Sequence, residues 1–456
     1  MKENDLVNAN RESSPLRQFK ATSSRPPINT SRGLVGWVRA KLFNNVWNTV
    51  LTLCVFVLLY FVLKPALNWA IFDAVWRAAN RRQCLAISPD GACWAGVIDW
   101  FNNLIYGRYP EPQQWRVNIG FLLGVAWLAS LTFKKTPYKV WVGICAIVLY
   151  PFLASYLFLG GSIGHDISVF HGVMSAAALG FFVLLYMNLV MRLFGKKCLH
   201  EYVVSRFTTL SLRNAKPMAF VTSWLIMSVV MAIVLFRVSL VLVPIDHWGG
   251  LFLTFIIAGF SITMAIPVGV VLALGRRSKL PVIHWLSLGV IELLRSVPLI
   301  TVLFMAVTLL PIFLPADVQI NKLSQVLVAV CLFAGAYMAE NIRGGLQAIP
   351  VGQYEAAQTL GLGYWKTMVL VILPQALRMM IPNIMTSFIS LLKDTTLVSI
   401  IGLFDIMLMA RNIANDKHWL GLDTEPLVLI SIIFFVLCYG MSQYSLNLEK
   451  RLKVDR

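Results

Sequence analysis

The chain has 456 residues, of which 58% are hydrophobic and 13% charged, and its mean hydropathy is +0.72. Apolar runs of about twenty residues recur along it, each long enough to cross ~30 Å of hydrocarbon as a helix, so the composition excludes a soluble domain. The formal net charge of +18 does not indicate a nucleic-acid partner, because the basic residues gather in alternate loops between the apolar runs, as they do in cytoplasmic loops.

The N-terminal segment is polar. Residues 1 to about 32 are rich in Ser, Asn, Pro and basic residues, and we expect a disordered cytoplasmic tail. Residues 33–43 interleave apolar side chains with Arg39 and Lys41, which fits either an amphipathic helix at the membrane interface or the flank of the first span. No cleavable signal is expected, because a long polar stretch precedes the first apolar run. Residues 1–45 form the first predicted domain, a tail with an interfacial helix.

The apolar runs predict an all-α polytopic membrane protein with about ten transmembrane helices. If the N-terminus is cytoplasmic, an even number of spans places the C-terminus and the basic loops in the cytoplasm too. Residues 398–413 are apolar but follow the polar residues 393–396. We expect a half-inserted helix there, since a further full span would put Lys450 and Arg451 outside. The predicted spans are residues 46–68, 117–133, 140–159, 168–191, 219–243, 249–274, 282–312, 324–345, 370–392 and 423–446.

Two of the seven cysteines, Cys84 and Cys93, share one polar loop, at about residues 69–116, which the topology places in the periplasm. An oxidising compartment favours a disulfide between them, and two free thiols are the alternative. The other cysteines lie singly in or beside the apolar segments, so no zinc-like pairing exists. Residues 46–216 are the second predicted domain, a transmembrane region with this loop.

Residues 160–164 read Gly-Gly-Ser-Ile-Gly, the G-x-S-x-G pattern of serine hydrolases, and are followed by His165, Asp166 and His171. A hydrolase needs its serine on a rigid turn with a base within hydrogen-bond reach, but all the candidate partners here crowd one outer turn. No third ligand with suitable spacing joins the two histidines. We therefore expect neither catalysis nor a metal site at this turn.

Charged residues inside the later spans are costly and tend to face a pathway or a partner. Glu292 and Arg295 share one helix face and can neutralise each other, and Pro298 after them should kink the helix. Glu340 and Arg343 repeat the spacing near the inner end of the next span. A structural ion pair and a place on a solute pathway both remain open for the first pair.

Residues 347–374 are too polar to cross a bilayer, although apolar runs flank them. Pro350 suits the start of a short helix, and Gly361 and Gly363 can adopt the left-handed conformation that ends one. A helix of two or three turns is not stable alone in water, so it needs a surface to pack against. Two consecutive alanines keep one flank thin enough to enter a groove. The stretch is predicted to be a docking helix.

This stretch resembles the EAA loop of ABC importer permeases, through Glu355-Ala-Ala357, Gly361 and, after nine intervening residues, Val371-x-Leu-Pro374. Val371 departs from the family, which more often has isoleucine there. The resemblance implies that the loop enters a cleft on a separate ATPase subunit and carries its motion into the membrane. The residues expected to couple to the ATPase are Gln353, Tyr354, Glu355, Ala356, Ala357, Gln358, Leu360, Gly361, Leu373 and Pro374.

Residues 217–456, the third predicted domain, resemble the permease core of polar amino-acid importers, a type I core of about five helices. Glu292, Arg295, Pro298 and Leu299 match the ExxRxxPL pattern of these permeases. A zwitterionic amino acid needs a cation for its carboxylate and an acceptor for its ammonium, and the first pair offers both. For Glu340 and Arg343 a gate or a loop anchor is favoured over substrate contact. For Asp394 and Thr395, interfacial anchoring and a place where cargo is delivered both remain open. The expected pathway and gate residues are Glu292, Arg295, Pro298, Glu340, Arg343, Asp394 and Thr395.

Most of the chain is similar to the permeases of general L-amino-acid ABC systems, through residues 33–37, the loop of residues 84–94 and the Tyr-Gly-Arg-Tyr-Pro of residues 106–110. The resemblance implies a bacterial inner-membrane protein with both termini in the cytoplasm. Its expected partners are a sister permease, two copies of an ABC ATPase subunit, a periplasmic amino-acid-binding protein and membrane lipid. The sister is expected to be similar but not identical, and a homodimer is the alternative.

The chain contains no G-x-x-x-x-G-K-[ST] phosphate loop, so we expect no enzyme activity and no bound cofactor, with ATP and Mg on the partner ATPase. The alternative function is a secondary amino-acid transporter driven by an ion gradient. Such transporters usually contain two related halves with matching broken helices, whereas the docking loop occurs once. A membrane scaffold or sensor would need an output domain, and none is seen.

Overall fold

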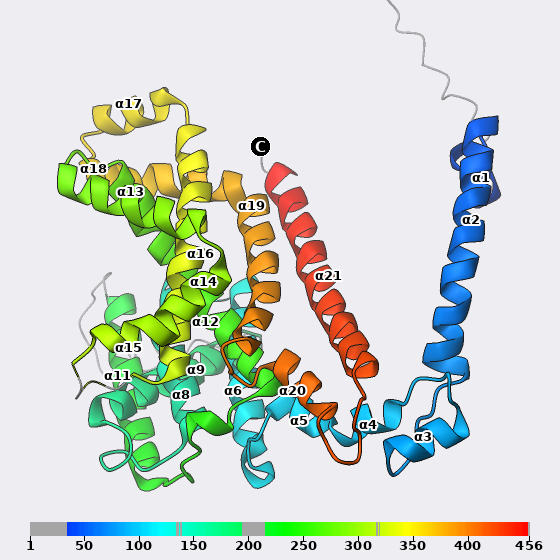
Figure 1. The fold of residues 1–456 in the computed structure, drawn as a ribbon. Helices are drawn as coiled ribbons and strands as arrows, with labels where there is room; N and C mark the ends of the chain where they lie inside the picture. Colours follow the sequence, from blue (N-terminus) through cyan, green and yellow to red (C-terminus); the bar gives the residue numbers. More distant parts are fainter. Residues whose placement is uncertain are drawn as a thin grey trace, which may run out of the picture. The chain divides into compact units, whose positions relative to one another are not determined.

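The structure is a computed structural model that describes residues 34–454 apart from 134–135, 137–138, 194–214, 316–317 and 319 (Figure 1). In this part of the chain the regular elements are helices, and the β pairing is limited to isolated bridges. The predicted all-α fold is therefore confirmed. The predicted tail, residues 1–32, and most of the basic loop before residue 215 lie outside the described residues.

Packing divides the chain into two units, residues 1–74 with 90–92 and residues 75–89 with 93–456. In the first unit α1 (Leu34–Lys41) precedes α2 (Val46–Leu67) and a π-helical turn, η1 (Asn68–Phe72). No α2 side chain is buried, and apolar residues cover its whole circumference, as expected of a membrane-spanning helix. α1 lies within the predicted helix of residues 33–43, and its location at the membrane interface stays a prediction.

The second unit begins with short helices and continues with a bundle of longer ones, which we call the accessory bundle. The short helices are α3 (Arg81–Ile87), α4 (Trp94–Asp99), α5 (Phe101–Tyr106) and the 3-10 turn η2 (Glu111–Gln113). The accessory bundle consists of α6 (Gln114–Thr132), α7 (Lys139–Val148), α8 (Tyr150–Leu159), α9 (Val169–Leu193) and α11 (Ala215–Arg237). Its interior centres on Trp127, which stacks on Phe181 with 5.7 Å between ring centroids.

The rest of the second unit, which we call the core, follows the turn η3 (Ile245–His247). Its elements are α12 (Gly250–Arg276), α13 (Pro281–Ser296), α14 (Leu299–Phe304), η4 (Met305–Leu309), α15 (Leu310–Phe313), α16 (Lys322–Gln347), α17 (Val351–Thr359), α18 (Tyr364–Thr367), η5 (Met368–Ile372), α19 (Leu373–Asp394), η6 (Thr395–Ser399), α20 (Ile406–Ile413) and α21 (Thr424–Val454). In Figure 1, α17, α18 and the last turns of α21 lie at one end of this unit, and α20, α4 and α5 lie at the opposite end. We call these the α17 end and the α20 end.

Of the described helices, nine are long and apolar enough to cross a membrane. The predicted span at residues 282–312 is different, because α13 and the helix that starts at Leu299 meet at an angle of 112°. Val297 is extended, since the ring of Pro298 disfavours a helical conformation in the residue before it. The kink predicted at Pro298 is thus a full break between two helices, which together still form a candidate span. α20 is a separate short helix, and its half-inserted position in the membrane stays a prediction.

The centre of the core is the crossing of α12 and α16, where glycine lets the two backbones approach closely. A Cβ on Gly269 would lie 2.7 Å from the side chain of Met338, and a Cβ on Gly335 would lie 2.4 Å from that of Val268. Larger residues would therefore push the helices apart. The same crossing brings Ala265 of α12 against α16, beside the cavity described below.

An aromatic cluster joins the accessory bundle to the core at the start of α12. Phe158 of α8 contacts Phe252 edge-on with 5.0 Å between centroids, and Trp248 with 5.9 Å. The hydroxyl of Tyr109 donates a hydrogen bond of 2.8 Å to the Phe158 carbonyl. All four side chains are buried, so the accessory bundle and the core share one continuous interior in this region.

Candidate functional site

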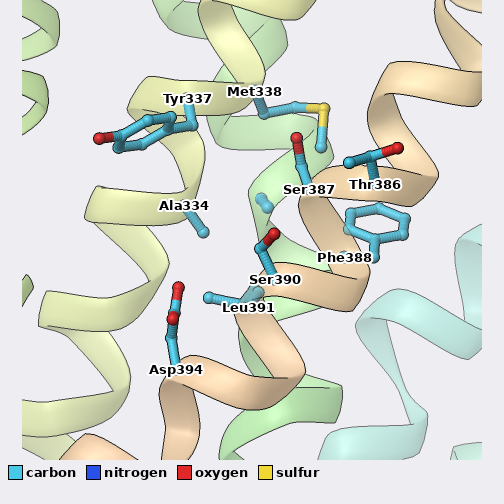
Figure 2. A pocket seen from close by; sticks show the side chains of 10 residues that line it. Ala334, Tyr337, Met338, Thr386, Ser387, Phe388, Ser390, Leu391 and Asp394 are labelled. Atoms are coloured by element: carbon cyan, nitrogen blue, oxygen red, sulfur yellow. The ribbon is translucent and has the colours of Figure 1, made fainter. Parts of the chain in front are cut away.

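A cavity of about 260 Å³ lies between α12, α16 and α19 (Figure 2). Its lining residues are Ala265, Ala334, Tyr337, Met338, Thr386, Ser387, Phe388, Ser390, Leu391 and Asp394. Most ligand pockets are concave, largely apolar and furnished with a few polar groups that orient the ligand, and this one has the same character. Its small volume suits a small solute.

The polar groups of the cavity come mainly from one face of α19. Ser387, Ser390 and Asp394 follow one another at the three- and four-residue spacing that lines up side chains along a helix. Figure 2 shows Asp394 near one end of the cavity and Tyr337 of α16 nearer the other. The Ser387 hydroxyl is fixed, because it accepts a hydrogen bond of 2.9 Å from the Asn341 amide and donates one to the Asn383 carbonyl.

Five charged side chains meet at the α17 end, and Glu340 of α16 is their centre. One carboxylate oxygen of Glu340 accepts from Arg343, whose Nε lies 2.9 Å away. The other oxygen lies 3.3 Å from Arg276 of α12 and 3.5 Å from Arg295 of α13. Arg276 also reaches Glu292, at 3.3 Å. We call these five residues the Glu340 cluster. It ties the ends of three helices together and carries one more positive charge than negative.

The predicted mutual neutralisation of Glu292 and Arg295 is corrected, because each pairs with another helix. Glu292 pairs with Arg276, and Arg295 pairs with Glu340. Spacing within α13 puts the two on one face, but α12 and α16 present oppositely charged partners to that face. Glu340 and Arg343 do pair, as their spacing predicts.

Arg295 connects the Glu340 cluster to the cavity. Its guanidinium lies 5.7 Å from the ring centroid of Tyr337, within the range of a cation–π contact, and Tyr337 also lines the cavity. Its Nε is buried and has no hydrogen-bond acceptor among the described residues. Pro298, three residues on, precedes the first residue of α14, just past the break. A positive group with an unused donor therefore lies behind one wall of the cavity.

The predicted docking helix is α17, with Pro350 just before its first residue. Tyr354 anchors it, because its hydroxyl donates to the Leu346 carbonyl at 3.3 Å and accepts from Arg277 at 3.1 Å. Ala357 is buried. Gln353 bonds to Gln375 of α19 at 3.1 Å. The helix is thus held to the ends of α12, α16 and α19.

The rest of α17 faces outward and ends sharply. The exposed residues at the predicted coupling positions are Gln353, Glu355, Ala356, Gln358, Leu360 and Gly361. Gly361 has a φ of +70°, and the N–H groups of Gly361 and Leu362 bond to the carbonyls of Gln358 and Ala357, a Schellman motif. Gly363 has a φ of −67°, so the left-handed conformation predicted there was wrong. Leu373 and Pro374 begin α19 after η5.

At the α20 end, Thr395 is buried at the start of η6, directly after Asp394. Cys84 and Cys93 form a disulfide, with Cα atoms 5.8 Å apart. Asp405 is fully buried and caps α20, since its Oδ1 accepts from the Leu408 N–H at 2.9 Å. Burial raises the pKa of Asp405 to about 7, although hydrogen bonds from the backbone and the charge of Arg411 act in the opposite direction.

The G-x-S-x-G turn has no catalytic geometry in the structure. The Ser162 hydroxyl donates to Asp166 at 2.9 Å, and His165 lies on the other oxygen of that carboxylate at 3.2 Å. His171 instead contacts Ser155, at 3.0 Å. The Ser162 backbone N–H, which donates to Asp166 at 2.8 Å, and the bonds from His165 and the Ser162 hydroxyl lower the pKa of the Asp166 carboxyl to about 2. The partner of the hydroxyl is a carboxylate of low pKa and not a histidine, so the turn is a hydrogen-bonded connection between α8 and α9.

Several residues of the site were not singled out from the sequence. Arg276 was counted only among the basic residues that set orientation. Ser387 and Ser390 were missed, although hydroxyls at helical spacing before Asp394 in an apolar span were a usable signal. Tyr337 had no such signal, because an aromatic residue in a span is ordinarily part of the packing.

The chain resembles known membrane proteins along nearly its whole length. Residues 265–454 match the family model of the binding-protein-dependent transport system inner membrane component. The chain is 38% identical to the inner membrane amino-acid ABC transporter permease protein YhdY of Escherichia coli K12, over 96% of this chain and 99% of the relative. It is 37% identical to the glutamate/glutamine/aspartate/asparagine transport system permease protein BztC of Rhodobacter capsulatus, over 94% and 96%.

A shorter relative is the probable glutamine ABC transporter permease protein GlnP of Bacillus subtilis. It is 33% identical, and 92% of its length matches 45% of this chain. More than half of the present chain therefore has no counterpart in that protein.

Protonation of Asp405 predicts a pH dependence of stability. Its pKa of about 7 exceeds the 3.8 of an ordinary Asp, so the folded chain binds this proton more tightly than the unfolded chain. Stability should therefore fall as the pH rises between these values, by at most ~1.4 kcal/mol per pH unit. We expect the thermal unfolding midpoint in detergent to fall more between pH 5 and pH 8 in the wild type than in D405N, which keeps an acceptor for the Leu408 N–H. An identical fall in both proteins would contradict the prediction.

Proposed function

We propose a transport route through this chain from the premise that it belongs to the amino-acid ABC transporter permeases, within the family of binding-protein-dependent transport system inner membrane components. It is accordingly a multi-pass inner-membrane protein of an ABC importer, a system that also contains an ATPase and a binding protein. This membership replaces the ion-gradient-driven alternative. The route, the gate, the orientation and the subunit composition are the proposal.

The cavity between α12, α16 and α19 is the proposed binding place of the transported amino acid. Asp394 accepts hydrogen bonds from the ammonium group of the substrate, and the hydroxyls of α19 orient its other polar atoms. Arg295, behind Tyr337, supplies the positive charge that draws the carboxylate. The observation that carries the proposal is this arrangement of a carboxylate on one side of a small cavity and a cation with an unused donor behind the other.

The Glu340 cluster is the proposed gate at the α17 end. An ion-pair network between helix ends holds α12, α13 and α16 together, and a solute can pass this end only when the helices separate. Arg276 and Arg277 are neighbours at the end of α12, and they bond to the cluster and to Tyr354 of α17, respectively. A movement of α17 therefore pulls on the same short segment that holds the gate.

The exposed face of α17 is the proposed contact with the ATPase. Its short length and its exposed Glu355, Ala356 and Gln358 support a helix that completes its packing on another protein. In this proposal the ATPase is present in two copies and holds ATP and Mg, and the present chain neither binds nor hydrolyses ATP. One core lines half of a pathway, so a sister permease completes it. We propose a similar but non-identical sister, with a homodimer as the alternative.

The proposed orientation has the α17 end and both termini in the cytoplasm. Arg276 and Arg277 lie at that end, as the positive-inside rule requires. The disulfide of Cys84 and Cys93 belongs to the opposite, α20 end, where an oxidising periplasm maintains it. The binding protein docks at the α20 end and releases its amino acid toward Asp394.

Replacing Gly361 should uncouple ATP hydrolysis from uptake. A valine at a φ of +70° is strained by ~1–3 kcal/mol, which distorts the end of α17 without a steric clash, since no atom lies within 4 Å of the added Cβ. We expect G361V to assemble and hydrolyse ATP in proteoliposomes, with uptake per ATP reduced about tenfold. The control is G363V, because Gly363 is equally open but has an ordinary φ. Equal uptake by the two variants would argue against a coupling role for α17.

Replacing Asp394 should impair transport more than assembly. Loss of a charge-assisted hydrogen bond costs ~1.5–3 kcal/mol, so D394N should reduce amino-acid uptake by roughly ten- to a hundredfold. The control is K393Q, since Lys393 is exposed and does not line the cavity. Uptake would be measured in proteoliposomes with the purified complex and its binding protein. Wild-type uptake by D394N would exclude the cavity as the route.

Replacing Arg295 tests whether the proposed gate and the cavity act together in transport. R295A removes one ion pair of Glu340 and the contact with Tyr337, but leaves Arg276 and Arg343 on the carboxylate. Uptake should fall about tenfold with the amount of assembled complex within about twofold of the wild type. K279A is the control, since Lys279 is an exposed basic residue beside the same end of α12. Normal uptake per complex combined with poor assembly would show that Arg295 serves only the fold.

A further inference from the structure

At the α20 end, a part of the chain that we call the clamp contacts a segment of the core. The clamp consists of residues 75–89 and 93–108. The contacted segment runs from residue 395, after α19, to residue 425, in the first turn of α21, and we call it the return segment. It starts directly after Asp394, the carboxylate of the cavity. Its first turn, η6, packs against both α19 and α20, and α5 packs against α20, so contacts that hold α20 act on the end of α19 that carries Asp394.

The first contact between the clamp and the return segment involves a buried carboxylate at the C-terminal end of that segment. Glu425, in the first turn of α21, is only 3% exposed. Its Oε1 accepts from the Cys93 N–H at 2.9 Å and pairs with Arg81 at 3.1 Å. A carboxylate is also stabilised at a helix N-terminus. Removing one partner of a buried pair leaves the other uncompensated, so the two groups of the clamp specify where α21 begins.

The second contact involves residues 418–422 of the return segment. Trp419, which is 2% exposed, donates its indole N–H to Asp99 at 2.9 Å. The backbone N–H of Arg81 donates to the His418 carbonyl at 2.8 Å. Gly96 leaves no room for a side chain here, because a Cβ would lie 2.5 Å from Leu422 and 2.7 Å from Trp419. This loop is thus fitted closely against α4.

The third contact involves Phe404, which precedes α20 in the sequence. The Arg108 guanidinium stacks 4.0 Å from the centroid of the Phe404 ring. The Phe404 carbonyl accepts from the Gly250 N–H at 2.7 Å, and Gly107 pairs with Trp248 beside it. The left-handed Gly107 has no space for a Cβ, which would lie 2.3 Å from Gly249. The return segment is therefore held at its middle as well as at its end.

We propose that the clamp residues Arg81, Asp99 and Arg108 are positioning residues for transport, holding the return segment so that Asp394 faces the cavity. This inference rests on the proposed route through the cavity. It gives a purpose to the clamp, which lies outside the part of the chain that matches the family model. The disulfide of Cys84 and Cys93 links the two partners of Glu425, because Cys93 is one of them and Arg81, the other, lies on the same short helix as Cys84.

The test compares R81A and E425Q with R82A in the complete importer in proteoliposomes. E425Q keeps the shape of the side chain and an acceptor for Cys93, but loses the charge opposite Arg81. Arg82 is exposed and next in sequence, so R82A controls for the loss of a positive charge at this place. We expect uptake per assembled complex to fall about tenfold in R81A and E425Q and to stay unchanged in R82A, with unchanged ATP hydrolysis in the absence of the binding protein.

A double-mutant cycle separates positioning from a general structural role. If the clamp acts through Asp394, the R81A/D394N double variant should transport no worse than D394N alone. Additive losses, or a loss confined to the amount of assembled complex, would overturn the inference. If R81A does not assemble, the same cycle with E425Q gives the answer. Normal uptake by D394N overturns the route itself, whereas normal uptake by R81A and E425Q overturns the clamp and leaves the route intact.

Discussion

The core depends on the need to neutralise a carboxylate at the end of a bundle of apolar helices. Glu340 satisfies this need with arginines from α12, α13 and its own helix. Because charges in such surroundings are costly when unpaired, the three helix ends are brought together by one acidic group. Arg277, adjacent to one of these arginines, then fixes α17 through Tyr354. The same few residues thus form the proposed gate and support the proposed contact with the ATPase.

The α20 end is organised by the same physical rule with different groups. Glu425 and Asp405 are both buried at the starts of helices, where backbone N–H groups and the helix dipole favour a carboxylate. At Asp405 the effect of burial is larger and raises the pKa to about 7. Glu425 is paired with a residue far away in the sequence, which brings the clamp onto the core. Between the two ends the interior is largely apolar, and the polar face of α19 lines the cavity there. In the proposed route a small solute meets the polar face of α19 after it enters from the α20 end and before it reaches the Glu340 cluster.

Single-helix reasoning from the sequence succeeded where one helix decides the outcome. The apolar runs predicted the spans other than the broken one, the polar break before residue 398 predicted the separate α20, and Gly361 predicted the end of α17. It failed where neighbours decide. The partners of Glu292 and Arg295 lie on α12 and α16, and no spacing within α13 reveals them. Gly363 has the same residue type as Gly361 but begins the next helix. The pairing of Arg81 with Glu425 joins residues 344 positions apart, which periodicity does not register.

The contact between α17 and the ATPase is the central claim, and site-specific photocrosslinking tests it most directly. A photoreactive phenylalanine derivative would be placed at Gln358 of α17 and, in a second variant, at Arg82 of the clamp, in the active assembled complex. The account predicts crosslinks to the ATPase from position 358 and none from position 82. Crosslinks to the ATPase from position 82, or none from position 358 in a complex that still transports, would contradict it.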